Sequence, residues 1–213
     1  PSTARASRMV IPKEICDAAQ DANYLSHDRI MAWLDAGGSI NDVDEEGYTL
    51  INCCTCGYRD TGHISHHHVA LARHLIALCA DVNIANALHN TTPFHNTAAT
   101  ECGQGQIDML SVLLAAKRPK PNVNARDCPP TNETPLGIRL RIGASIHLLN
   151  SLTLSRTARM VRELLRAGAS LDACDGDRTA EDILERRELL ESSVGLAGDE
   201  PWKEIKAMVA GVR

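Results

Sequence analysis

The sequence predicts an all-α fold, a solenoid-like array of helix–turn–helix units that repeat along the chain. Apolar residues at helical spacing run four times into a short unit in which an apolar residue precedes Asn or Asp. A second unit, built around a threonine, follows each of these after seven to ten residues. Only 3% of the 213 residues are aromatic, so small and aliphatic side chains must fill the core. Such a core suits closely packed helices, and the regular recurrence indicates a repeat architecture.

The first series marks the ends of four predicted helices. Their apolar residues are Ile30, Trp33 and Leu34; Leu71, Leu75 and Ile76; Leu110, Leu113 and Leu114; and Val161, Leu164 and Leu165. The units that follow them are Gly38-Ser39-Ile40-Asn41, Ala80-Asp81-Val82-Asn83, Pro121-Asn122-Val123-Asn124 and Ala169-Ser170-Leu171-Asp172. Spacings of three and four residues indicate one buried face of a helix. The sequence therefore predicts a helix that runs into an extended turn in each unit.

The second series marks four predicted helix starts. Its segments are Gly47-Tyr48-Thr49, Asn90-Thr91-Thr92-Pro93, Asn132-Glu133-Thr134-Pro135 and Asp177-Arg178-Thr179. The residue two before each threonine is Gly, Asn, Asn or Asp, and these types tolerate a positive φ. Threonine is a good N-cap, and proline suits the first turn of a helix. Each unit is therefore expected to hold a tight turn, a capped helix, a connection and a second helix.

These residues resemble the ankyrin repeat. Its signature, Gly-x-Thr-Pro-Leu-His-x-Ala, is matched most closely by Thr92-Pro93-Phe94-His95, and its helix end by Leu164-Leu165-Arg166-Ala167-Gly168-Ala169. The resemblance extends from about Lys13 to the neighbourhood of Glu191 and covers four recognisable turns between atypical ends. It implies that His95 braces the start of its helix by hydrogen bonds. It also implies that protein partners bind the concave face and the turn tips.

The sequence departs from that family in its period. The four threonines are 43, 42 and 45 positions apart, whereas the family repeats about every 33 residues. The surplus is expected between the helices of a pair, at Gly57 to Ser65, Glu101 to Gln106 and Ile142 to Ser155. Leu50 replaces the signature proline and Gly137 replaces its histidine, which leaves helix boundaries open but not the architecture.

The two ends of the chain are predicted to differ from the repeats. Residues 1–12 are expected to be a flexible segment or residues added to the native chain, and residues 13–213 a single repeat domain. Near 200–210, acidic residues and Pro201 predict the start of one more helix. With Trp202, Ile205 and Val209 on one side, this helix would cap the last repeat.

Cysteine and histidine residues suggest one metal site. Cys53 and Cys56 share a helix face, and His63, His66, His67 and His68 follow within about a dozen residues. Two thiolates and an imidazole such as that of His66 could bind zinc. The favoured interpretation is instead that the cysteines pack in the core and the histidines are solvated in a loop, so no metal ligand is predicted. The eight cysteines are expected to be reduced thiols, because the chain shows no export signal.

Other function classes find no support in the sequence. No phosphate-binding glycine loop, Gly-x-Ser-x-Gly or His-Glu-x-x-His motif occurs, so neither an enzyme nor a cofactor is predicted. The net charge of −5 and scattered basic residues argue against nucleic acid, and no run of 18 apolar residues could span a membrane. A monomer in the cytoplasm or nucleus is expected.

The predicted partner-binding residues lie at the turn tips. They are Glu45, Glu46, Tyr48, Leu88, His89, Thr91, Thr131, Glu133, Asp175 and Arg178. Tyr48 and Leu88 are expected to be exposed side by side as an apolar hot spot, and the acidic residues beside Tyr48 favour a partner with basic residues. The sequence thus favours a non-catalytic protein-interaction module. The alternatives are the zinc-stabilised variant and a targeting or regulatory subunit of a larger enzyme assembly.

Overall fold

The computed structural model describes residues 10–23, 25–100, 103–144, 151–172, 174–194 and 200–212, and these are all-helical with ten α-helices. Their bounds are α1 Lys13–Asp21, α2 Ser26–Asp35, α3 Leu50–Cys56, α4 His66–Ala77, α5 Pro93–Ala99, α6 Gln104–Leu114, α7 Pro135–Gly143, α8 Ser151–Arg166, α9 Ala180–Val194 and α10 Glu200–Gly211. Among the described helices, none combines the length with the hydropathy that a membrane-spanning segment needs.

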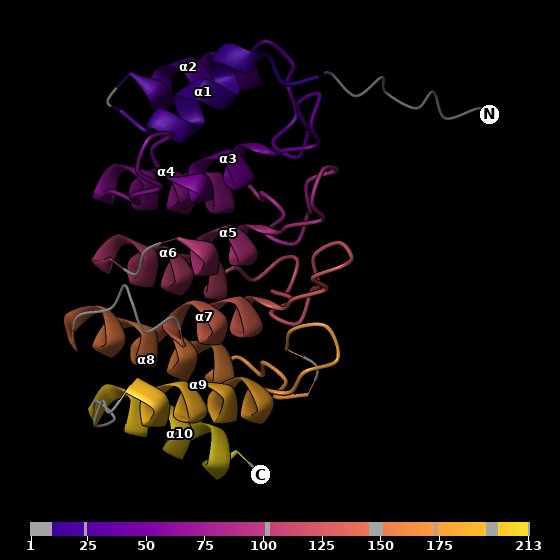
Figure 1. Cartoon of the computed structure of the whole chain (residues 1–213). Helices are drawn as coiled ribbons and strands as arrows, with labels where there is room; N and C mark the ends of the chain where they lie inside the picture. Colours follow the sequence, from indigo (N-terminus) through magenta and orange to yellow (C-terminus); the bar gives the residue numbers. More distant parts are fainter. Residues whose placement is uncertain are drawn as a thin grey trace.

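Consecutive helices form pairs, and the pairs lie one above another from α1–α2 to α9–α10 (Figure 1). The odd-numbered helices contact one another in succession from α1 to α9, and α4, α6, α8 and α10 form a second row. The connections from each pair to the next project from one side of the stack (Figure 1). A continuous core, mostly of aliphatic residues, alanine and cysteine, runs through the stack.

The threonine turns start four helices as the sequence predicts. Thr49, Thr92, Thr134 and Thr179 directly precede α3, α5, α7 and α9. Two residues before the first three threonines, Gly47, Asn90 and Asn132 have φ values of 84°, 53° and 49°. The same expectation for Asp177 is wrong, because the positive φ of 58° belongs to Gly176. Glycine adopts this conformation at lower cost than aspartate, so the turn uses it one position earlier.

The structure explains why the short unit after each predicted helix recurs with Asn at its last position in the first three repeats. Asn41 accepts a hydrogen bond from the amide of Asp81 at 2.7 Å, and its side chain donates to the carbonyl of Cys79 at 3.4 Å. Asn83 makes the same two bonds to Asn122 and Lys120, and Asn124 makes them to Ser170 and Gly168. Each asparagine therefore ties the end of one helix pair to the end of the next.

The connections within pairs differ in part from expectation. The α3–α4 connection occupies residues 57–65, as predicted. The prediction of an insertion at Glu101 to Gln106 is wrong in extent, because α6 already begins at Gln104. The Gly103 amide donates to the Gln106 side chain at 3.0 Å and so closes the start of α6. Leu152 and Leu154 belong to α8, whereas Ile146, Leu148 and Leu149 lie outside the described residues.

The chain ends in the predicted helix. In α10, Trp202, Ile205 and Val209 are all buried, and the helix packs mainly on α8. The guanidinium of Arg187 on α9 lies 4.1 Å from the centre of the Trp202 ring, a cation–π contact between the last two helices.

Candidate functional site

The predicted turn-tip residues fall into three groups by burial. Glu45, Glu46, Leu88, His89, Thr131 and Arg178 are exposed, and Leu88 is 59% exposed. Tyr48 and Thr91 are half-buried. Glu133 and Asp175 are buried, so they do not project from the stack.

Glu133 and Asp175 are buried because neighbouring turns pair with each other there. The two residues form an isolated antiparallel bridge, and Asp175 forms another with Arg178. The Glu133 carboxylate accepts a hydrogen bond from Nη2 of Arg141 at 2.9 Å, and the Asp175 carboxylate lies 2.8 Å from Nη2 of Arg178. Burial of a carboxylate is costly unless a cation accompanies it. Backbone pairing at these two residues joins the adjacent turns, and their carboxylates are buried with local arginines rather than offered as a surface.

Hydrogen bonds between successive turns align the exposed tips. The Ala87 amide donates to the Glu46 carbonyl at 3.1 Å, and the Cys128 amide donates to the His89 carbonyl at 3.0 Å. Further along, Arg126 donates to the carbonyl of Gly176 at 3.2 Å. The tips therefore form one continuous row, named here the turn-tip surface: Glu45, Glu46, Leu88, His89, Thr131 and Arg178.

A cleft of about 760 Å³ adjoins this surface at its N-terminal end, between α1, α3 and the turn that joins α2 to α3. Its charged lining residues are Lys13, Asp17, Asp44, Glu45, Glu46 and Arg59. Asp17 pairs with both Lys13 and Arg59, and the remaining three carboxylates give the cleft a net negative charge. We call it the acidic cleft.

Tyr48 lines the acidic cleft and packs against the core instead of standing free beside Leu88. Burial is the main reason that the pKa of its hydroxyl is raised, and the nearby Cys56 and Glu46 add to the effect. Of the two side chains expected to be exposed, Leu88 is exposed, whereas Tyr48 is half-buried.

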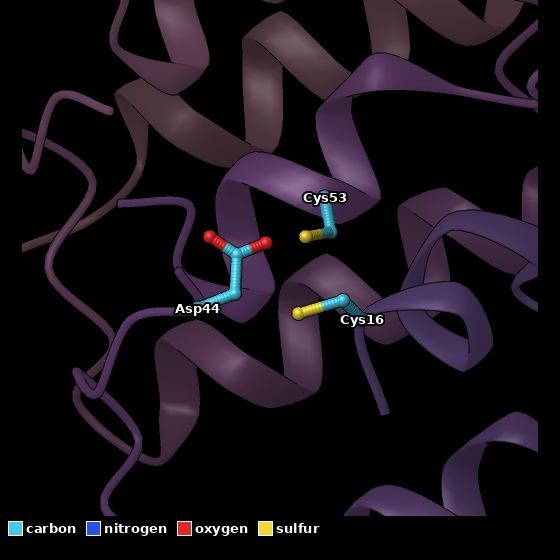
Figure 2. Close-up of side chains that lie close together, drawn as sticks. All are labelled: Cys16, Asp44 and Cys53. Atoms are coloured by element: carbon cyan, nitrogen blue, oxygen red, sulfur yellow. The ribbon is translucent and has the colours of Figure 1, made fainter. Parts of the chain in front are cut away.

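One cluster of thiol and carboxylate groups lies in the wall of this cleft. Three ligand atoms lie within 4.8 Å of one another: the sulfur of Cys16 on α1, the sulfur of Cys53 on α3 and a carboxylate oxygen of Asp44. Figure 2 shows their side chains close together. Cys16 and Cys53 are buried and Asp44 is half-buried. The pKa of the Cys53 thiol is raised well above its usual value by its hydrogen bond with Cys16, by burial and by the nearby charges of Cys56 and Asp44. Burial also raises the pKa of Cys56 to about 11.

The zinc set that the sequence offered as an alternative, Cys53, Cys56 and His66, does not come together in the described residues. Cys53 joins Cys16 and Asp44, and neither Cys56 nor His66 belongs to that cluster. The histidines also differ from the expected solvated loop, since His66, His67 and His68 form the first turn of α4. His68 is fully buried, and its Nδ1 accepts the amide proton of Ser65 at 3.2 Å.

Sequence reasoning missed Cys16 because it lies far from Cys53 along the chain. The repeat itself carried a signal, since Cys16 is the fourth residue of α1 and Cys53 the fourth residue of α3. Equivalent positions of stacked helices lie one layer apart, which brings these two thiols together. Asp44 entered the sequence analysis only as one of the acidic residues near Tyr48, without a role as a ligand.

A scan against protein-family models finds no match to this chain, and a search of curated proteins finds none either.

Proposed function

We propose that the chain is an ankyrin-type repeat array that binds a partner protein at the turn-tip surface and the adjoining acidic cleft. The observation that carries the proposal is the set of hydrogen bonds that join each turn to the next. A surface that is already ordered loses little conformational entropy when a partner binds. The helices are occupied by stacking, which leaves the turns as the recognition elements.

The chemistry of this surface favours a partner with basic residues close to an apolar side chain. Glu45 and Glu46 lie at the mouth of the acidic cleft. The hydrogen bond from Ala87 to Glu46 brings the exposed Leu88, the next residue, beside this acidic tip. A basic side chain would gain from the carboxylates, while an apolar one would cover Leu88.

The test is affinity capture from the source cell with three forms of the chain. One is the intact chain, and one carries Glu46→Lys with Leu88→Ala at the turn-tip surface. The matched control carries Glu185→Lys with Leu189→Ala, the same chemistry on α9, where Glu185 and Leu189 are both exposed. We expect the intact chain and the control to recover the same protein, and the turn-tip variant to recover at least about tenfold less.

Equal recovery by the turn-tip variant and the control would place the binding surface elsewhere. If none of the three forms enriches a protein, the interaction function is wrong. A catalytic chain that co-purifies with the intact form would identify the array as the targeting or regulatory subunit of an enzyme assembly.

A further inference from the structure

We infer that Cys16, Cys53 and Asp44 form a zinc-binding site whose fourth coordination position opens into the acidic cleft. The three ligand atoms lie within 4.8 Å of one another and come from two layers of the stack. The inference goes beyond partner binding, and it concerns a different ligand set from Cys53, Cys56 and His66.

The ligand types and their separation suit this ion. Zinc binds cysteine sulfur at about 2.3 Å and carboxylate oxygen at about 2.0–2.2 Å, in tetrahedral geometry. Ligand atoms around such an ion are therefore separated by about 3.5–3.8 Å. Small side-chain adjustments bring the three atoms from their present spacing to that geometry. Two soft thiolates select zinc over magnesium and calcium, which prefer all-oxygen sites.

Asp44 is held in place by its own turn. Its Oδ1 atom accepts hydrogen bonds from the amides of Glu46 at 3.0 Å and Tyr48 at 2.8 Å. The carboxylate is thereby fixed before any metal arrives, and its second oxygen retains lone pairs for a cation. Support of this kind from neighbouring groups is a regular feature of metal sites.

The charge around the cluster also favours a cation. Lys13 and Arg59, the two basic residues of the cleft, are both paired with Asp17. The cleft nevertheless has four carboxylates, on Asp17, Asp44, Glu45 and Glu46, so its net charge beside the two thiols is negative. The cleft gives the ion a path to the cluster and room for a water molecule as fourth ligand.

Zinc bound here would join α1 and α3 to the turn between α2 and α3. Three ligands with one solvent-filled position are typical of sites that exchange their fourth ligand. Because the cleft adjoins the turn-tip surface, a partner side chain could replace the water.

The site can be tested with Co²⁺ as a spectroscopic substitute for zinc. The full chain is stripped of metal, kept reduced and titrated with Co²⁺. We expect one equivalent to bind, with thiolate-to-cobalt charge-transfer absorption and the visible bands of tetrahedral cobalt, and Zn²⁺ to displace it. Zinc should also raise the Tm of the intact chain.

Three variants assign the ligands. Cys53→Ala removes a sulfur ligand and should weaken Zn²⁺ binding at least about 100-fold, because second-shell changes alone cost about 10–100-fold. Asp44→Asn keeps the Oδ1 acceptor for the turn but removes the charge, so it should fold normally and bind zinc at least about tenfold more weakly. Cys54→Ala is the matched control, since Cys54 is a buried thiol on the same helix outside the cluster. It should bind zinc as the intact chain does.

Absence of charge-transfer absorption in the intact chain would overturn the inference. So would Zn²⁺ affinity that Cys53→Ala and Asp44→Asn leave unchanged. Urea unfolding of each variant without metal verifies that it is folded, so that a loss of binding is not a loss of structure. Neither outcome bears on the capture experiment, in which Asp44 and the cysteines are unaltered.

Discussion

Gly137, the third residue of α7, lies against the backbone of the next layer. A Cβ atom added there would lie 1.7 Å from the carbonyl oxygen of Cys174. The same carbonyl accepts the Thr134 amide at 3.0 Å, so it cannot move away without breaking the contact that starts α7. In the ankyrin signature a histidine stands at the position of Gly137. Here the backbone of the following turn fills the space that its side chain would need.

The replacement Gly137→Ala should destabilise the protein by at least about 2 kcal/mol, because a rigid backbone atom occupies the place of the new methyl group. Gly211→Ala is the matched control, since a Cβ at the end of α10 meets nothing within 4 Å. Its free energy of unfolding should stay within about 0.5 kcal/mol or rise slightly. Urea unfolding of both variants measures the difference, and similar losses would show that the Gly137 contact is not tight.

The sequence showed at residue level which positions were unusual, but not why. Gly137 was visible as a departure from the repeat signature, whereas the carbonyl that requires it belongs to a turn much later in the chain. Glu133 and Asp175 were predicted to be exposed because their positions in the turns match, and their burial depends on pairing between turns. The Cys16, Cys53 and Asp44 cluster likewise exists only once two layers stack. Contacts between layers were the part that sequence patterns could not supply.

At the scale of single elements, two helices start with the same histidine arrangement. Nδ1 of His68 on α4 accepts the Ser65 amide, and Nδ1 of His95 on α5 accepts the Thr92 amide at 3.1 Å. Nε2 of each ring then faces a backbone carbonyl, that of Gln20 at 2.8 Å or that of Glu133 at 3.1 Å. Because Nδ1 of each ring accepts a hydrogen bond, it carries no proton, and Nε2 donates its proton to the carbonyl. Both rings are therefore assigned as neutral, with the proton on Nε2. The sequence predicted this role for His95 and missed it for His68.

Both histidines should make the protein less stable as the pH falls. Burial lowers the pKa of each histidine. The pKa of His68 is lowered further by the nearby His63 and His67 and is raised by Asp21. The pKa of His95 is raised by Asp127, which opposes the effect of burial. The unfolded chain therefore binds more protons than the folded one below the ordinary histidine pKa of about 6.5. Stability is complete above that pH and declines below it, by at most about 1.4 kcal/mol per pH unit for each histidine.

The measurement is the urea midpoint at pH 7.5 and at pH 5.5, which should be clearly lower at pH 5.5. The double variant His68→Gln with His95→Gln serves as control, because glutamine can close the same capping arrangement and does not titrate. Its midpoint should change less between the two pH values. An equal decline in both proteins would mean that other groups cause the pH dependence.

Helix ends were predicted better than the connections, for a local reason. Thr49, Thr92 and Thr134 act through backbone within a few residues, so their sequence pattern is sufficient to place α3, α5 and α7. The limits of the insertion near Gln104 depended on the bond between Gly103 and Gln106, which no repeat signature contains.

At the scale of the whole molecule, the main contacts between the described helices join each pair to its neighbours along the stack. The side chains of Asn41, Asn83 and Asn124 follow the same rule, since each bonds to the backbone of the adjacent unit. The free energy of unfolding of such an array is approximately the sum of the stabilities of its units and of the interfaces between neighbouring units. A destabilising substitution at one end therefore need not unfold the other end. The chain carries a natural reporter near each end, because its two tryptophans are Trp33 on α2 and Trp202 on α10.

This arrangement predicts that the two ends respond differently to a core change in the last layer. Ile205 on α10 is fully buried, and Ile205→Ala should cost about 2–5 kcal/mol locally. The change is made in a Trp33→Phe background, where Trp202 alone fluoresces, and in a Trp202→Phe background, where Trp33 alone does. In urea, the unfolding midpoint reported by Trp202 should fall markedly, while that reported by Trp33 should move much less.

The mirror-image change Ile30→Ala in the first layer, where Ile30 is equally buried, should reverse the order. Equal shifts at both reporters would show instead that the five helix pairs unfold as one cooperative unit, because the interfaces between layers would then be too strong for one end to open alone.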